Sequence, residues 1–253
     1  MIKYVFCINT GRSGSHYLAN ILNCCNNVRA YHEPHPVMNG KPMFEYLKGN
    51  KNLLLTLLHE KIEVIQESVN YGEVYFETNH AFIKGFAWEI VNRVPHSEIG
   101  VIYLKRNLDD IVKSFHRIDT TPLNFNGKNW MYTPLMEKPE TSLSLIFKLE
   151  YRVLFFLNRL FKSKYNKKIF KFGKPKYFIE KEINYLKWYV KESDLQARKF
   201  KNKYPKIKYF ELENDNLNVI ETYKTMFEFF NITFSPQEGF YSRVGVTTNL
   251  KAN

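Results

Sequence analysis

The sequence has few cysteines, few acidic residues and no long apolar run, and each shortage excludes a class of protein. The 3 cysteines in 253 residues match neither a disulfide framework nor a metal-ligand spacing. The longest apolar stretch, residues 145–161, is interrupted by charged side chains and is too polar to span a membrane. No signal peptide precedes the apolar stretch that starts at Tyr4, so we expect a cytoplasmic protein.

Acidic residues are outnumbered by basic ones. The chain has 37 Lys and Arg against 25 Asp and Glu, a formal net charge of +12, which favours an anionic partner. Residues 148–176 hold ten Lys or Arg and one acid, Glu150, so this basic segment has a net charge of +9. It fits a solvated face, a site for an acidic acceptor such as a glycan, or a peripheral contact with an anionic membrane.

Apolar runs alternate with amphipathic stretches along most of the chain. Short apolar runs that end at turn residues predict strands at residues 3–9, 28–32, 73–78, 99–106 and 206–213. Helical periodicity predicts helices at residues 15–25, 51–69, 81–94, 107–118, 143–163, 178–202 and 216–231. This alternation is typical of a three-layer α/β/α fold with a central, mainly parallel sheet. We expect one domain over 1–253, with variable acceptor or lid regions at about 34–50 and 119–176.

The first strand runs directly into a turn rich in glycine and serine and then into a helix. Glycine permits close approach and positive φ, and backbone amides at a helix N-terminus converge on an anion. Serine hydroxyls and an arginine fork would add donors. The turn therefore predicts a phosphate cradle, although an ordinary βα turn has a similar composition. The candidate residues are Gly11, Arg12, Ser13, Gly14, Ser15 and His16.

A second candidate anion site follows another strand. Arg106 ends the strand at residues 99–106, and Ser114 lies eight residues later in the next helix. The carboxyl ends of parallel strands border the crevice where open α/β sheets bind ligands. Two anion sites on such units suggest a nucleotide with phosphates at both ends.

These residues resemble those of a known enzyme family. "TGRSGSHYL" resembles the 5′-phosphosulfate loop of sulfotransferases that use 3′-phosphoadenosine 5′-phosphosulfate (PAPS), in the Arg-Ser-Gly-Ser form of carbohydrate and bacterial members. "YLKRNLDDIVKSF" resembles their 3′-phosphate motif, and residues 205–233 resemble their late strand, acidic turn and helix. The resemblance implies a P-loop-like fold and transfer of a sulfuryl group from PAPS to a hydroxyl or amine of a carbohydrate or other small molecule. The product would be adenosine 3′,5′-bisphosphate.

The resemblance also explains a missing feature of the turn. A Walker A loop ends in Gly-Lys-Ser/Thr and uses its hydroxyl to hold Mg²⁺, whereas this turn has no such ending. Sulfuryl transfer from PAPS in this family is in-line and needs no metal, so no metal site is expected. The resemblance implies that Arg12 stabilises charge that develops on the leaving phosphate.

The general base is expected in "YHEPHP", which follows the first helix. Glu33 matches a Glu-Pro motif of related sulfotransferases, and burial in a crevice would raise the pKa of its carboxyl group. His32 and His35 are rival bases, because neutral imidazole suits the role without adjustment. A metal site built from these three residues is disfavoured by the intervening prolines.

Two other functions remain open at this level. A P-loop small-molecule kinase is the alternative enzyme, although the strand that ends at Arg106 carries no Walker-B-like Asp. A non-catalytic basic module that binds nucleic acid or a membrane has only the basic segment in its favour, and we expect no nucleic-acid partner. The sequence does not predict an oligomeric state.

Overall fold

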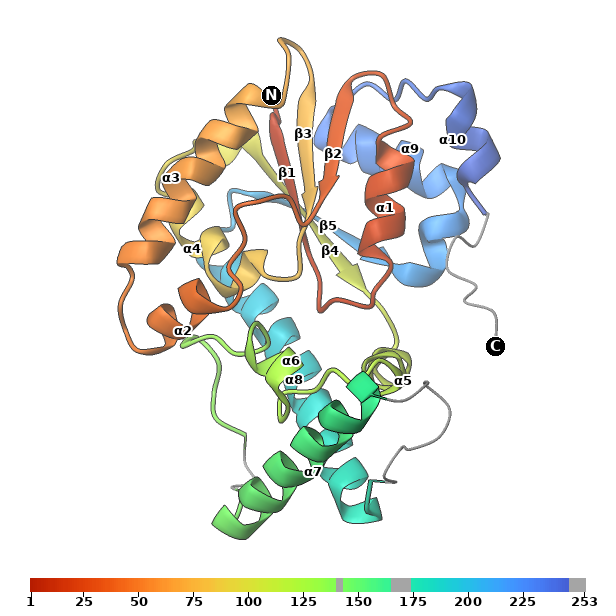
Figure 1. Ribbon diagram of the computed structural model, residues 1–253. Helices are drawn as coiled ribbons and strands as arrows, with labels where there is room; N and C mark the ends of the chain where they lie inside the picture. The colour runs from red at the N-terminus through yellow and green to blue at the C-terminus, as the bar shows by residue number, and fades with distance from the viewer. Residues whose placement is uncertain (140–142, 165–173, 246–253) are drawn as a thin grey trace.

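A five-stranded parallel sheet forms the centre of the fold. The computed structural model describes residues 1–139, 143–164 and 174–245. The strands lie in the order β2-β3-β1-β4-β5 and every neighbouring pair is parallel (Figure 1). Their bounds are Tyr4–Ile8 (β1), Val28–His32 (β2), Val74–Thr78 (β3), Ile99–Lys105 (β4) and Lys208–Glu213 (β5). The predicted α/β class is confirmed.

Helices cover both faces of the sheet, as expected for parallel strands that are apolar on both sides. In β1, Val5 and Cys7 face one layer, whereas Phe6 and Ile8 face the other. The first layer holds α1 (Ser15–Leu22), α9 (Ile220–Phe230) and α10 (Glu238–Arg243). The second holds α3 (Asn52–Glu67), η1 (Phe82–Lys84), α4 (Phe86–Ile90) and the end of α8 (Lys176–Lys203). The three-layer prediction is therefore confirmed.

Further helices lie beyond the carboxyl ends of the strands, at the bottom of Figure 1. They are α2 (Lys41–Leu47), α5 (Leu108–Arg117), α6 (Phe125–Lys128), α7 (Leu145–Lys164) and the start of α8. Short 3-10 helices η2 (His96–Glu98) and η3 (Asn214–Asn218) precede β4 and α9. The regions predicted to be variable, 34–50 and 119–176, thus contribute α2, α6 and α7 to this end, and residues 140–142 and 165–173 lie outside the described residues.

The predicted helix at residues 81–94 is the main error in the secondary structure. Gly85 has an extended φ of −158°, which divides the segment into η1 and α4. A Cβ at this position would lie 2.9 Å from Leu54 Cδ1, so the glycine lets the break pack closely against α3. Periodicity does not reveal such a break, because the apolar positions of the two short helices continue almost in phase.

A buried ion pair joins the second layer to the sheet and to the loop after β2. Lys61 of α3 lies 3.0 Å from the Glu77 carboxylate of β3, and both side chains are almost fully buried. Tyr75 and Asn79 also donate to Glu77, at 2.7 and 2.8 Å. Lys61 Nζ donates to the Pro34 carbonyl at 2.7 Å, so it holds the chain immediately after Glu33. Burial lowers the pKa of Lys61, and Glu77 opposes that effect.

We predict that Lys61→Met destabilises the protein strongly. Removal of one partner leaves the Glu77 carboxylate buried without its cation, which costs about 3–5 kcal/mol. The matched control is Lys51→Met, which removes an exposed cation 3.1 Å from Glu89 and should cost at most about 1 kcal/mol. Urea unfolding measures both free energies, and equal losses for the two variants would contradict this role of Lys61.

Candidate functional site

A cleft of about 860 Å³ opens at the carboxyl edge of the sheet. It lies beside the neighbouring strands β1 and β4. The chain that follows β1 runs to β2, at one edge of the sheet, and the chain that follows β4 runs to β5, at the other edge. Such a reversal of strand order is the place where open α/β sheets bind ligands. Nine of the predicted site residues line it: Gly11, Arg12, Gly14, Ser15, His16, His32, Glu33, Arg106 and Ser114. Ser13 lies beneath the cleft surface, and the exposed His35 is not part of the lining.

The turn between β1 and α1 has an unusual backbone. Gly11, Arg12 and Gly14 have φ values of 78°, 58° and 94°, which is the left-handed region. Arg12 is not a glycine, so its conformation is strained by local sterics. The Asn9 side chain accepts from the Gly11 amide at 2.8 Å, and Asn214 Nδ2 donates to the Ser13 carbonyl at 2.7 Å. These contacts hold the turn from both ends.

The turn presents donors that the protein does not use. Gly14 precedes α1 and no side chain caps that helix. Among the hydrogen bonds of the described residues, none is donated by the amides of residues 12–16, and the buried hydroxyl of Ser13 also has no partner. Buried polar groups almost always have a partner, so unpaired donors at a helix N-terminus indicate a site for an anion.

The two predicted anion motifs meet at this turn. Arg12 Nε donates to Ser114 Oγ at 3.0 Å, and Arg106 donates to the Arg12 carbonyl at 2.9 Å. Asn107 caps α5 by accepting from the Asp109 and Asp110 amides, which fixes the helix that carries Ser114. Burial lowers the pKa of Arg12, and the positive charges of Arg117 and Arg106 lower it further. Three guanidinium groups thus share one edge of the cleft.

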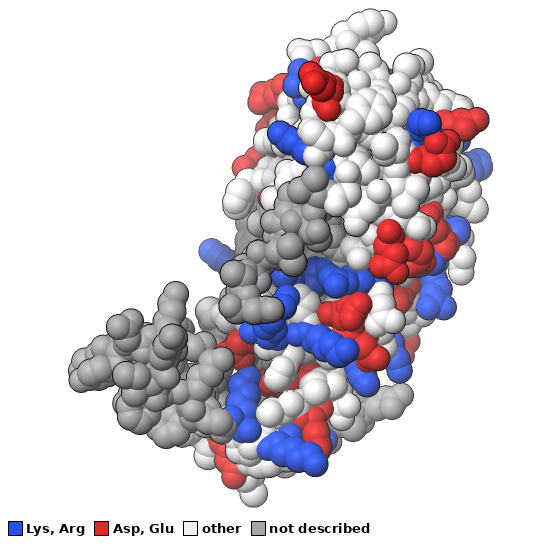
Figure 2. Space-filling view, turned by 90° about the vertical axis from the view of Figure 1, so that its right-hand side faces the viewer, with Lys and Arg blue, Asp and Glu red and all other residues white. Residues whose placement is uncertain are grey.

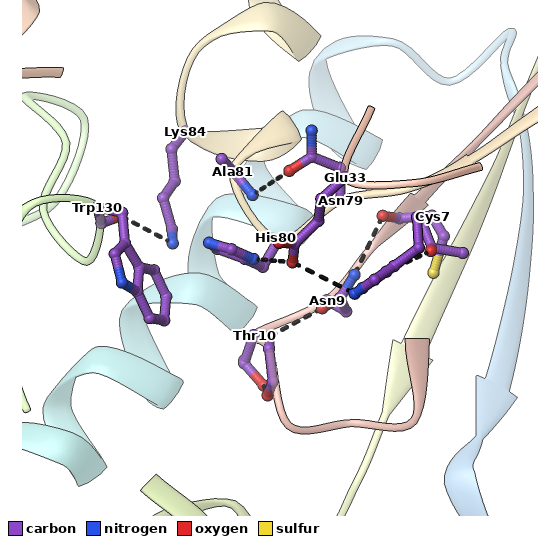
Figure 3. A network of polar contacts seen from close by, with 12 residues as sticks. Cys7, Asn9, Thr10, Glu33, Asn79, His80, Ala81, Lys84 and Trp130 are labelled. Carbon is purple, nitrogen blue, oxygen red and sulfur yellow. Dashed lines mark hydrogen bonds and ion pairs between the residues drawn. The ribbon is translucent and has the colours of Figure 1, made fainter. Parts of the chain in front are cut away.

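The predicted base lies in the same cleft, beside a histidine, His80, that packs against Gly11 and that the sequence analysis did not select. Glu33 Oε1 makes a short hydrogen bond with His80 Nδ1, and His32 Nε2 lies 3.8 Å from the same oxygen (Figure 3). Glu33 has a left-handed φ of 50°, and its amide donates to the Thr78 carbonyl at 2.9 Å. The backbone of Glu33 is therefore fixed by Thr78, and its carboxylate is held by His80.

The expected rise in the pKa of Glu33 is wrong. Burial raises it, but the hydrogen bond from His80 and the positive charges of His80, His32 and Lys84 outweigh burial, so the pKa of Glu33 falls below its ordinary value. Burial lowers the pKa of His80, with the Glu33 hydrogen bond opposing, and burial also lowers the pKa of His32. The pair is thus an ionised carboxylate and a neutral imidazole, with the Nδ1 proton directed at Glu33.

A buried lysine lies between this pair and the turn that joins β1 and α1. Lys84 Nζ donates to the Trp130 carbonyl at 3.0 Å and to Tyr189 Oη at 2.9 Å, and Tyr189 in turn donates to the Thr10 carbonyl at 2.7 Å. The Trp130 ring lies against His80, with ring centroids 4.2 Å apart. In Figure 3 the His80 ring lies between Glu33 and Lys84. Burial lowers the pKa of Lys84 well below its ordinary value.

Sequence reasoning missed these contact residues, because each is far along the chain from the motif that it supports. His80, Trp130, Tyr189 and Asn214 carry no local pattern that distinguishes them from ordinary polar or aromatic positions. The only local signal was that His80 follows a strand directly, near the edge where ligands bind.

Two absences apply to the part of the chain that the structure describes. Residues 1–139, 143–164 and 174–245 contain no group of three or more potential metal ligands. No helix in those ranges is long and apolar enough to cross a membrane.

We predict that Gly14→Ala destabilises the turn by more than backbone strain alone. A Cβ at Gly14 would lie 2.5 Å from Asn214 Nδ2 and 2.7 Å from Leu217 Cδ1. The control is Gly49→Ala, which has a similar φ of 89° and open space around its Cβ. An alanine in the left-handed conformation lowers the free energy of unfolding by about 1–2 kcal/mol in both variants, and overpacking lowers it by about 1–3 kcal/mol more in Gly14→Ala. Urea unfolding compares them, and an equal loss would show that the turn does not pack on η3.

Comparisons with known proteins place the fold. No protein-family model matches the sequence, and no curated protein matches it. A solved sulfotransferase from Alicyclobacillus acidocaldarius is similar at 10% identity over 94% of this chain and 85% of that chain, with a TM-score of 0.49. The sulfotransferase domain from the curacin biosynthetic pathway is 13% identical over 93% of this chain and 76% of that domain, with a TM-score of 0.50.

A third solved structure is similar to the same extent. The sulfotransferase domain from the Synechococcus PCC 7002 olefin synthase is 9% identical over 98% of this chain and 80% of that domain, with a TM-score of 0.50. The similarity to the curacin and olefin synthase domains extends over nearly the whole chain, but the sequence identity is very low. What is similar is therefore the spatial arrangement of helices and strands. The chain therefore has a fold of the sulfotransferase type.

Proposed function

We propose that the protein is a PAPS-dependent sulfotransferase. One observation carries the proposal: a phosphate turn with unused donors, a second cationic motif and a carboxylate–imidazole pair line the same cleft. The sulfotransferase-type fold supports it, as does the resemblance of the two motifs to the family's donor-binding segments.

The residues of the cleft fit the two phosphate ends of the donor. Among the described residues, the Ser13 hydroxyl and the amides of residues 12–16 have no hydrogen-bond partner, and these donors suit a 5′-phosphosulfate. Arg106 and Ser114 suit the 3′-phosphate, because Arg106 Nε is buried without a partner. When bound, PAPS supplies the sulfuryl group. Arg12 supplies positive charge where the leaving phosphate becomes more negative.

Glu33 and His80 form the base in this proposal. Ionised Glu33 accepts a hydrogen bond from the Nδ1–H group of His80, so the free lone pair of the imidazole is on Nε2. His80 Nε2 makes no hydrogen bond with other described groups, and the residue lines the cleft. Nε2 can therefore take the proton of the acceptor hydroxyl, while Glu33 orients the ring and stabilises the imidazolium that forms. This assigns Glu33 the supporting role rather than that of direct proton acceptor.

The acceptor is a carbohydrate or another small alcohol or amine in this proposal. Asn39, Thr120 and Trp130 come from the two variable regions and line the cleft. An aromatic surface beside polar groups suits a ligand with an apolar face and hydroxyl edges. Mass spectrometry of an acceptor panel incubated with PAPS and excess chelator tests the function. The proposal expects a sulfate mass gain, whereas phosphate transfer from ATP that requires Mg²⁺ would support a small-molecule kinase instead.

We predict that Arg106→Ala removes the preference for a 3′-phosphate. Loss of a charge-assisted contact should weaken binding of adenosine 3′,5′-bisphosphate about 10- to 100-fold and leave adenosine 5′-phosphate nearly unchanged. Arg29→Ala is the control, because Arg29 pairs with Glu73 and lies outside the cleft lining. Calorimetric titration measures both nucleotides. Equal weakening of the two by Arg106→Ala would refute the placement of the 3′-phosphate.

We predict that turnover depends on the neutral form of His80. A base must be unprotonated, so kcat should fall as pH drops through the pKa of His80, which burial places below 6.5. His80→Asn and Glu33→Gln should each lower kcat by about 10²- to 10⁴-fold without weakening nucleotide binding. His35→Asn, an exposed residue outside the cleft, serves as the control. If His32→Asn abolishes turnover and His80→Asn does not, the base is His32.

A further inference from the structure

Helix α7 has an apolar stripe on its outer surface. The exposed fractions are 82% for Leu145, 71% for Ile146, 66% for Leu149, 50% for Val153 and 59% for Phe156. At about 100° per residue, these five side chains share one arc of about 100° along three turns of the helix. We call this set the α7 stripe. Scattered exposed apolar residues are normal, but a continuous stripe on one helix marks a surface that contacts something.

The inner face of α7 is already packed, so the stripe is not needed for folding. Phe147 and Tyr151 are buried on the opposite side, and Phe147 packs against Phe178 of α8 with ring centroids 4.9 Å apart. Tyr151 also makes a short hydrogen bond with the buried Glu182. In Figure 1, α7 lies at the end of the molecule away from the sheet. The stripe is therefore a second apolar face on a helix whose first face is satisfied.

Unpaired cations border the stripe. Lys148 and Arg152 are exposed and lie at its edge by helical position, and Lys128 of α6 is close enough to both that their charges lower its pKa, after the larger effect of burial. None of the three has an ion pair within the described ranges. The single acid on this part of α7, Glu150, accepts a hydrogen bond from Tyr177. On the face shown in Figure 2, Lys and Arg lie interspersed with Asp and Glu in the lower half of the molecule.

We propose that the α7 stripe and its three bordering cations bind the surface of an anionic lipid bilayer. An apolar helix face of this length with Lys and Arg beside it matches the composition of helices that lie in the membrane interface. An antiparallel second copy is disfavoured as the occupant, because stripe-to-stripe contact in that orientation would bring Lys148 and Arg152 of the two copies together. A bilayer accepts apolar side chains and supplies negative charge at the same time.

Co-sedimentation of the full chain with lipid vesicles tests the proposal. The protein should sediment with vesicles of phosphatidylcholine and phosphatidylserine, less with pure phosphatidylcholine, and less as salt rises. Lys148→Gln and Arg152→Gln should each reduce the partition coefficient roughly fivefold. Leu149→Asp with Val153→Asp should reduce it by more than about tenfold.

Matched controls separate the stripe from general effects. Leu55→Asp introduces one of the two added charges at an exposed leucine of α3, outside the stripe, and should leave vesicle binding nearly unchanged. Every variant should keep the wild-type Tm and bind adenosine 3′,5′-bisphosphate as the wild type does, whichever function the cleft has. The proposal is wrong if the wild type ignores phosphatidylserine vesicles at low salt, or if Leu149→Asp with Val153→Asp binds them as well as Leu55→Asp does. Dimers that only the stripe variant dissociates, without vesicle binding, would instead identify a second copy as the occupant.

Discussion

The cleft depends on one strained turn. Between β1 and α1 the chain passes through left-handed conformations at Gly11, Arg12 and Gly14, and it leaves the Ser13 hydroxyl buried without a partner. Such a turn is stable only where the surroundings determine it. Phe115 of α5 lies beside Gly11, Asn214 of η3 holds the Ser13 carbonyl, and Tyr189 of α8 holds Thr10. These three contacts come from distant parts of the chain. The turn with the unpaired donors is therefore also the place where α5, η3 and α8 meet.

The charge distribution of the cleft follows a single pattern. Among the described residues, no carboxylate pairs with the guanidinium groups of Arg12, Arg106 and Arg117, which share one edge of the cleft. Unpaired charges of this kind cost free energy unless an anion binds there. Elsewhere in the cleft, the hydrogen bond from His80 lowers the pKa of Glu33 in spite of burial, and burial lowers the pKa of His80. The proposed transfer of a sulfuryl group assigns the anionic donor to the first set of groups and the proton acceptor to the second.

Local sequence patterns predicted the strands, most helices and the two anion motifs, because these depend on residues close together in the chain. Asn107, at the start of the helix predicted at residues 107–118, accepts from the Asp109 and Asp110 amides within the same short segment. The helix break at Gly85 and the reversed pKa shift of Glu33 were not predictable, since both follow from contacts across the fold, with Leu54 and His80. The hydrogen bond between Arg12 and Ser114 could not be predicted from local patterns either, because it joins residues 102 positions apart.

Calorimetric titration of the wild-type protein with adenosine 3′,5′-bisphosphate in excess chelator tests the central claim most directly. The cleft is lined by cations and, among the described residues, by donors without a partner, and those residues form no metal-ligand group. The account predicts one site per chain with clearly tighter binding than adenosine 5′-phosphate, unaffected by Mg²⁺. Binding of ATP that requires Mg²⁺, with no measurable affinity for adenosine 3′,5′-bisphosphate, would contradict it.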